Sequence, residues 1–213
     1  MEYLGECDVE ATLSVKYPFR RRSEHIKRVY MWAERILENQ DYPSGINKDA
    51  VLTAAVFHDA GYALISDDGI MHAERSAEVF VEYALLHNYE PEKKDFISYL
   101  IRSHSDKQLM REMDTPIELI VLMEADLLDE TGALSIVWDC MAEGAADEQS
   151  FIKTYEHIKK YSGRILNREP MVTQKGKQLW QEKQKFTRSF IQQLAYDLGI
   201  DEKLDGQTAV KKR

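Results

Sequence analysis

Apolar side chains recur at steps of three and four residues along most of this chain, and this spacing constrains the fold more than any other feature. Side chains at such steps lie on one face of an α-helix, because the helix turns every 3.6 residues. The residues between positions 23 and 38 that follow it are Ile26, Val29, Tyr30, Ala33, Ile36 and Leu37. Five prolines and ten glycines in 213 residues leave little room for a turn-rich β architecture. We therefore predict an all-α protein.

The same reading predicts eight helices, over residues 23–38, 48–58, 72–87, 91–104, 116–128, 133–142, 148–161 and 173–198. Residues 48–58 are apolar on nearly every side, which is typical of a helix at the centre of a fold. Residues 201–213 are polar, and we expect them to be frayed. The length suits one domain with an ample core, so we predict a single all-α domain over residues 1–213.

Charge and composition exclude several classes of partner. The formal net charge is −9 and the isoelectric point about 5.2, which argues against a protein that grips nucleic acid or an anionic membrane through bulk charge. Cys7 and Cys140 are too few for a disulfide scaffold, and we expect reduced thiols. The N-terminus is acidic, and no apolar run approaches the length of a membrane span. These features predict a cytoplasmic protein.

The dipeptide His58-Asp59 closes the apolar segment 48–58 and is the first candidate for a functional site. Adjacent imidazole and carboxylate groups are good ligands for divalent metals. His25 and Asp126 lie on other predicted helices, and an Asp inside a core-facing helix is costly to bury unless it binds a partner. These four residues predict a metal site with room for water on a six-coordinate Mn, Fe or Mg ion. We expect Asp129 to support Asp126 or its neighbours.

A divalent ion in such a site would activate water for attack on phosphorus without a protein nucleophile. Asp59 could position that water, and a cation must neutralise the phosphate oxygens. Arg75 is the first candidate for this contact. Arg22 and Lys27 are the next, within a basic cluster at residues 16–28 that also holds Arg20 and Arg21. A small anionic substrate is therefore compatible with a chain too acidic for a polyanion.

The ordered pattern of His25, His58-Asp59 and Asp126 resembles the HD-domain superfamily of metal-dependent phosphohydrolases. The local sequences at residues 25–29, 57–62, 72–77 and 125–133 look like a subgroup of small bacterial HD hydrolases, some of which cleave nucleoside triphosphates to the monophosphate and pyrophosphate. The resemblance implies a helical bundle with an HD core at about residues 23–137, a C-terminal helical extension at about 148–199, and a nucleotide-like phosphate substrate. Glu124 and Leu127 depart from the subgroup, which usually has Asp and Arg at these positions.

His72 and His104 extend the pattern to the order seen in dinuclear HD proteins, in which the added pair holds a second iron. Some of these relatives, such as the inositol and phosphonate oxygenases, activate dioxygen. The spacing from Asp59 to His72 is short for the oxygenases, so we expect a one-metal hydrolase with His72 and His104 lining the catalytic pocket. A dinuclear iron oxygenase and a non-catalytic metal- or ligand-binding module remain as alternatives. The number of ions and the oligomeric state are left open.

Overall fold

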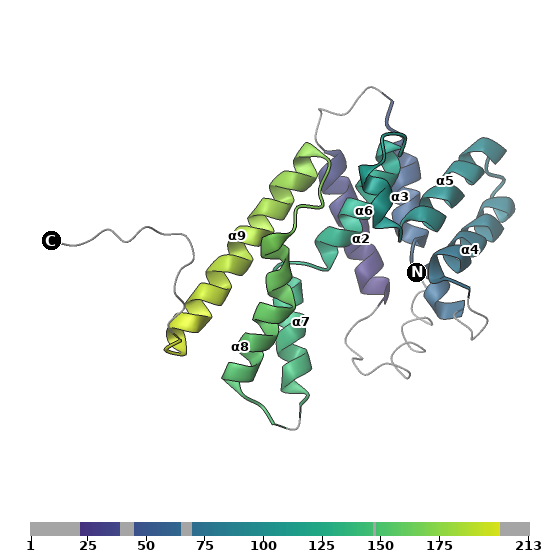
Figure 1. Ribbon diagram of the computed structural model, residues 1–213. Coiled ribbons are helices and arrows are strands. Elements are labelled where there is room, and N and C mark those ends of the chain that lie inside the picture. The colour runs from purple at the N-terminus through teal and green to yellow at the C-terminus, as the bar shows by residue number, and fades with distance from the viewer. Residues whose placement is uncertain (1–21, 39–44, 65–69, 147, 201–213) are drawn as a thin grey trace. The chain divides into compact units, whose positions relative to one another are not determined.

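The computed structural model describes residues 22–38, 45–64, 70–146 and 148–200, and these residues form helices and no strand (Figure 1). The prediction of an all-α fold is confirmed. The α-helices are α2 (Arg22–Leu37), α3 (Lys48–Phe57), α4 (His72–Leu86), α5 (Pro91–Ser103), α6 (Ile117–Asp129), α7 (Ala133–Gly144), α8 (Phe151–Lys160) and α9 (Gln174–Asp197). Three short 3-10 helices join them: η1 (Ala60–Leu64), η2 (Lys107–Arg111) and η3 (Ser162–Asn167).

Each α-helix coincides with a predicted segment, although the first residue of α8 differs by three positions. Ser150 is extended, and its hydroxyl accepts a hydrogen bond from the Lys153 amide, so it caps the helix and Phe151 begins it. Four predicted features lie outside the described residues: Arg20, Arg21, Cys7 and the segment 201–213. None of the described helices combines the length and the apolar character needed to cross a membrane.

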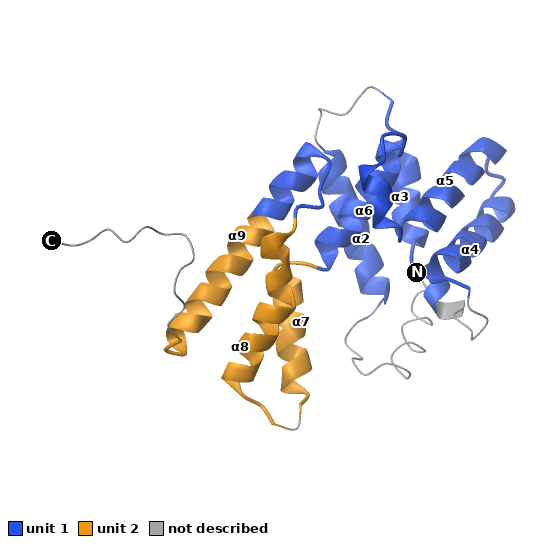
Figure 2. Cartoon of the chain, viewed as in Figure 1, with its two compact units in different colours: residues 1–130, 169–181 blue, residues 131–168, 182–213 orange. Residues whose placement is uncertain are grey.

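The chain divides into two compact units (Figure 2). Unit 1 comprises residues 1–130 and 169–181, and unit 2 comprises residues 131–168 and 182–213. Helix α9 belongs to both, because the boundary falls after Gln181. The chain thus contains two compact units, and the single domain expected over residues 1–213 stays a prediction.

Helix α3 lies at the centre of unit 1, where it packs against α2, α5 and α6. Its Val51, Ala54 and Ala55 side chains are completely buried. Two of these are alanines, whose small side chains let neighbouring helices approach closely. The C-terminal end of α3 is therefore buried as well, and His58 and Asp59 follow it directly.

Gly61 allows η1 to lie directly against the first turn of α4. A Cβ atom at this position would lie 2.4 Å from the Ser76 amide nitrogen and 2.5 Å from the His72 carbonyl oxygen. The Gly61 amide also donates a hydrogen bond to the Ser76 hydroxyl at 2.9 Å. This contact sets the distance between the segment after Asp59 and the start of α4, where His72 lies.

Glu124, one of the two departures from the subgroup pattern, anchors the start of α9 within unit 1. Its carboxylate is completely buried and accepts hydrogen bonds from the amides of Val172 and Thr173 at 2.6 and 2.8 Å, and from the Thr173 hydroxyl at 2.5 Å. Burial raises the pKa of Glu124, although the bonds from Thr173 oppose this effect. Glu124 therefore joins α6 to the segment that leads into α9, and these hydrogen bonds, rather than a ligand, occupy its carboxylate.

Unit 2 has a core of its own. Its buried residues are Ile136, Tyr155, Ile158, Ile191 and Ala195. Asp139 of α7 ties this unit to η3, since its carboxylate accepts hydrogen bonds from the Ser162 amide at 3.2 Å and the Ser162 hydroxyl at 2.5 Å. Unit 2 thus has its own apolar cluster and its own buried polar anchor.

Replacing Gly61 by Ala should destabilise the protein by about 1–3 kcal/mol, because the new methyl group must displace backbone atoms of α4. Chemical denaturation of the metal-free protein measures this change. Gly144→Ala is the matched control: its Cβ would meet no atom within 4 Å, so this variant should be neutral or slightly more stable. Equal stabilities for the two variants would contradict the close approach of η1 and α4.

Candidate metal centre

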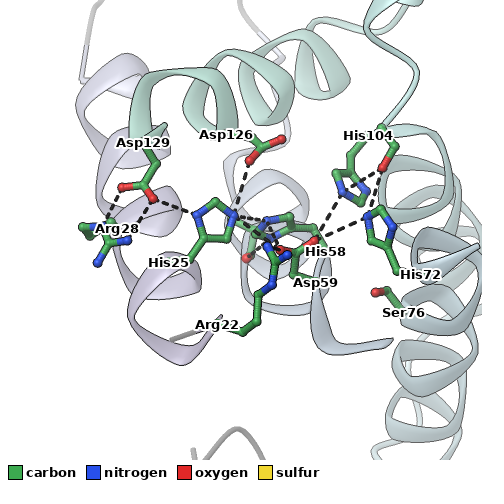
Figure 3. A network of polar contacts seen from close by, with 12 residues as sticks. Arg22, His25, Arg28, His58, Asp59, His72, Ser76, His104, Asp126 and Asp129 are labelled. Atoms are coloured by element: carbon green, nitrogen blue, oxygen red, sulfur yellow. Dashed lines mark hydrogen bonds and ion pairs between the residues drawn. The ribbon is translucent and has the colours of Figure 1, made fainter. Parts of the chain in front are cut away.

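Six predicted site residues from five segments of unit 1 meet in one cluster (Figure 3). His25 lies on α2 and Asp126 on α6, while His58 and Asp59 follow the end of α3. The other two are His72, which begins α4, and His104, which caps the C-terminal end of α5. Side chains separated by up to 101 positions in sequence are thus brought together by the packing of the helices.

Asp59 is at the centre of this cluster, and its two carboxylate oxygens face different histidines. The Oδ2 atom lies 3.4 Å from His25 Nε2 and 3.8 Å from His58 Nε2. The Oδ1 atom lies 3.5 Å from His72 Nε2 and 3.7 Å from His104 Nε2. Asp59 therefore belongs to two groups with metal-ligand geometry, one with His25 and His58 and the other with His72 and His104.

Three of the histidines are oriented by hydrogen bonds from the opposite side of the ring. The Nδ1 atom of His58 donates to the Ala55 carbonyl at 2.8 Å, and that of His104 donates to the Ile101 carbonyl at 2.6 Å. A carbonyl oxygen only accepts, so Nδ1 carries the proton and, in the neutral ring, Nε2 keeps its lone pair for a metal. His25 is held in the same way by Asp129, whose carboxylate lies 2.7 Å from Nδ1.

Asp129 therefore supports His25, which is a neighbour of Asp126 in the cluster. Its carboxylate also accepts hydrogen bonds from Arg28 at 2.6 and 3.1 Å. A buried carboxylate needs such partners to remain charged. The result is a chain from Arg28 through Asp129 to His25, of the kind that orients a metal-binding imidazole.

Asp126 contacts the first group from the side of α6. Its Oδ1 atom lies 3.3 Å from His25 Nε2, and its Oδ2 atom accepts a hydrogen bond from Lys107 at 2.7 Å. Lys107 is on η2 and also donates to the His104 carbonyl at 2.8 Å. Lys107 was not predicted from the sequence, because a single lysine in a short 3-10 helix belongs to no periodic pattern or motif.

The predicted cations occupy different positions relative to the cluster. Arg22 donates a hydrogen bond to Asp59 Oδ2 at 2.9 Å, and its guanidinium lies 3.7 Å from the centre of the Tyr62 ring. Arg75 instead forms an ion pair with Glu78 at 3.3 Å along α4. Lys27 is exposed on α2. Among the described residues, Arg22 and Lys107 are thus the cations in contact with the predicted carboxylate ligands.

Protonation states in the cluster suit a metal. Burial would raise the pKa of Asp59, but the surrounding imidazoles and the Arg22 guanidinium, 2.9 Å from Oδ2, lower it below its ordinary value. Burial lowers the pKa of His58 to about 4 and also lowers that of His72. Ionised carboxylates beside neutral imidazoles are the protonation states that divalent ions require, so the donor set fits such an ion.

His25 is the exception. Burial acts to lower its pKa, but hydrogen bonds with Asp126 and Asp129 outweigh this effect and raise the pKa to about 9. Because Nδ1 already bonds Asp129, the additional proton lies on Nε2, where it faces Asp59 and Asp126. A metal ion must displace this proton to bind His25.

Comparisons with known proteins agree with this geometry. Residues 22–131, just over half of the chain, match a family model described as "HD domain". A comparison with curated proteins gave no match. The segment includes every predicted metal-binding residue, whereas α7, α8 and α9 lie beyond it.

Solved structures of bacterial proteins share the fold across almost the whole chain. A predicted HD-superfamily hydrolase from an uncultured Thermotogales bacterium is 20% identical, with 93% of this chain and 92% of that one covered and a TM-score of 0.62. YpgQ of Bacillus subtilis is 26% identical, with coverage of 94% and 100% and a TM-score of 0.57. A second structure of YpgQ, in complex with ADP, is also 26% identical, with coverage of 84% and 90% and the same TM-score.

Metal binding should release about one proton from His25 below pH 9, because its pKa near 9 keeps Nε2 protonated in the metal-free protein. The apparent affinity for Mn²⁺ should therefore rise about tenfold per pH unit between pH 6 and 8. Calorimetry in buffers of different ionisation enthalpy counts the released protons. Asp129→Asn, which removes a partner that raises this pKa, should release fewer. Proton release that does not depend on Asp129 would contradict the assignment.

Proposed function

Because the chain belongs to the HD-domain superfamily of hydrolases, we propose that it is a metal-dependent phosphohydrolase that cleaves a phosphate ester or anhydride of a nucleotide. The observation that carries this proposal is the group of His25, His58 and Asp59 within unit 1, which has metal-ligand spacing and which Asp126 contacts at His25 Nε2. Nitrogen and carboxylate donors together suit Mn, Fe or Mg. The nucleotide is supported by the ADP complex of YpgQ.

These four residues would hold one divalent ion, and His72 and His104 would line the pocket beside it. A bound ion supplies Lewis acidity toward a phosphoryl oxygen and lowers the pKa of coordinated water. The proposed reaction accordingly needs no side-chain nucleophile. It does need cations for the phosphate oxygens and a hydrogen-bond donor for the leaving oxygen.

Arg22 and Lys107 are the cations best positioned for the phosphate oxygens. Arg22 already bonds Asp59, and Lys107 already bonds Asp126, so each is held beside a proposed ligand. Their side chains are 17% and 29% exposed, which leaves both accessible to a ligand entering from solvent. Stacking on Tyr62 restricts the Arg22 guanidinium. Contact of Arg75 and Lys27 with the phosphate oxygens stays a prediction.

His72 is our candidate for a hydrogen bond to the leaving oxygen. Its side chain is 18% exposed, whereas that of His104 is 3% exposed. The Ser105 hydroxyl lies 3.2 Å from Nε2 of each ring. Because Nδ1 of His104 donates to Ile101, its Nε2 is the ring atom open to a donor. One hydroxyl has one proton to donate, so Ser105 donates to His104 Nε2 and accepts from His72 Nε2. In this arrangement a proton is held at His72 Nε2, on the open side of the cluster.

The shared carboxylate of Asp59 also favours a second candidate function, that of a dinuclear iron oxygenase. Metal analysis and oxygen consumption separate the two. Two irons per chain with an oxygen-dependent product would replace the hydrolase proposal. Phosphate or pyrophosphate release with Mn²⁺ or Mg²⁺ and no oxygen uptake would support the hydrolase proposal.

A screen of nucleoside mono-, di- and triphosphates with Mn²⁺ or Mg²⁺ tests the proposed activity, and Asp59→Asn tests its site. This variant loses a carboxylate that faces both histidine pairs. We expect metal affinity and kcat/KM to fall by more than about 100-fold, since even outer-shell partners change metal affinity 10- to 100-fold. The control Asp95→Asn alters an exposed carboxylate beside Lys94 and should change neither.

Two outcomes would contradict the proposal. If no nucleotide releases phosphate or pyrophosphate with any of these metals, the chain is better described as a non-catalytic binding module. If Asp59→Asn retains metal and full activity, the reaction takes place at a different site.

A further inference from the structure

A cavity of about 520 Å³ lies beside the second histidine pair, between the start of α4 and the end of α5. Ser105 lines it, and this residue's hydroxyl contacts both His72 and His104. Met71, which directly precedes His72, lines it as well. The cavity and the candidate metal centre therefore share a wall. Its volume is within the range of small-molecule sites in proteins.

The walls of this cavity combine apolar surface with paired charges. Ile70 and Met71 are 39% and 65% exposed and supply the apolar part. On the polar side, the Arg102 guanidinium donates to Glu74 at 2.6 Å, so the charge of this arginine is already matched by a carboxylate. Asp106 adds a second carboxylate. The charged groups of the lining thus sum to about −1, from one cation and two acids.

This charge balance decides which part of a substrate suits the cavity. A phosphate group would meet two carboxylates and an arginine that is already paired, so it is disfavoured there. The metal centre has the opposite character, with Arg22, Lys107 and the proposed ion. A neutral, flat group with N–H donors suits the cavity, since apolar walls cover its faces and the carboxylates accept its hydrogen bonds.

We propose that the cavity lined by Met71, Glu74, Arg102 and Ser105 binds the nucleobase of the substrate, with the phosphates at the metal centre. This inference rests on the proposed nucleotide substrate and assigns its base to a defined subsite. Met71 and Ile70 contact the faces of the base, and Glu74 accepts hydrogen bonds from its edge. The subsite makes recognition depend on the base as well as on the phosphates.

Equilibrium binding tests the inference separately from turnover. Adenosine, guanosine, cytidine and uridine monophosphates are titrated into the Mn²⁺-loaded protein by calorimetry, with ribose 5-phosphate as the probe that lacks a base. We expect at least one nucleotide to bind about tenfold or more tightly than ribose 5-phosphate. Met71→Ser should weaken the binding of that nucleotide about tenfold and leave the binding of ribose 5-phosphate unchanged. The reason is that the variant removes contact with the base alone.

Leu86→Ser is the matched control, since Leu86 is an exposed apolar residue at the opposite end of α4 and should affect no probe. Equal affinities for the nucleotides and ribose 5-phosphate would overturn the inference. The inference would also be overturned if Met71→Ser bound the preferred nucleotide normally, or if it bound the nucleotide and ribose 5-phosphate more weakly by the same factor. An absence of hydrolysis with base-dependent binding intact would refute the proposed phosphohydrolase but support the subsite.

Discussion

The contact between the Asp59 carboxylate and the histidines around it is the interaction on which the candidate site depends. Each oxygen faces a different pair of imidazoles, and Arg22 adds a cation. A buried carboxylate keeps its charge only where such partners surround it. The packing of α3 serves this requirement, because the small side chains within the helix bring its C-terminal end into the centre of unit 1.

Helix ends supply much of the precision of the site. His58 and His104 each follow the last residue of a helix, and each donates from Nδ1 to the carbonyl three residues earlier. Carbonyls in the last turn of a helix lack partners within that helix, so a histidine at this position satisfies one and is oriented by it. His25 lies inside a helix and needs a more distant partner, which Asp129 provides.

Charge is distributed unevenly in a chain whose net charge is −9. Arg22, Arg28 and Lys107 bond acidic residues of the candidate metal centre, while the neighbouring cavity carries two carboxylates and one paired arginine. The two environments differ in what they attract: the first favours anionic groups, and the second favours a neutral group with hydrogen-bond donors. A nucleotide carries anionic phosphates and a neutral base with hydrogen-bond donors, so a single ligand fits both environments. This connects the two proposals.

The sequence by itself determined the helices, the all-α class and the family resemblance, because helical periodicity and ligand order are encoded along the chain. It also predicted His25, His58, Asp59 and Asp126 as metal ligands, since polar groups at the ends or within apolar helices require partners. Only the tertiary structure assigned Asp129 to His25, brought Lys107 to Asp126 and divided the chain into two units. The physical reason is that these contacts depend on distances between packed helices, which residue spacing along one helix does not specify.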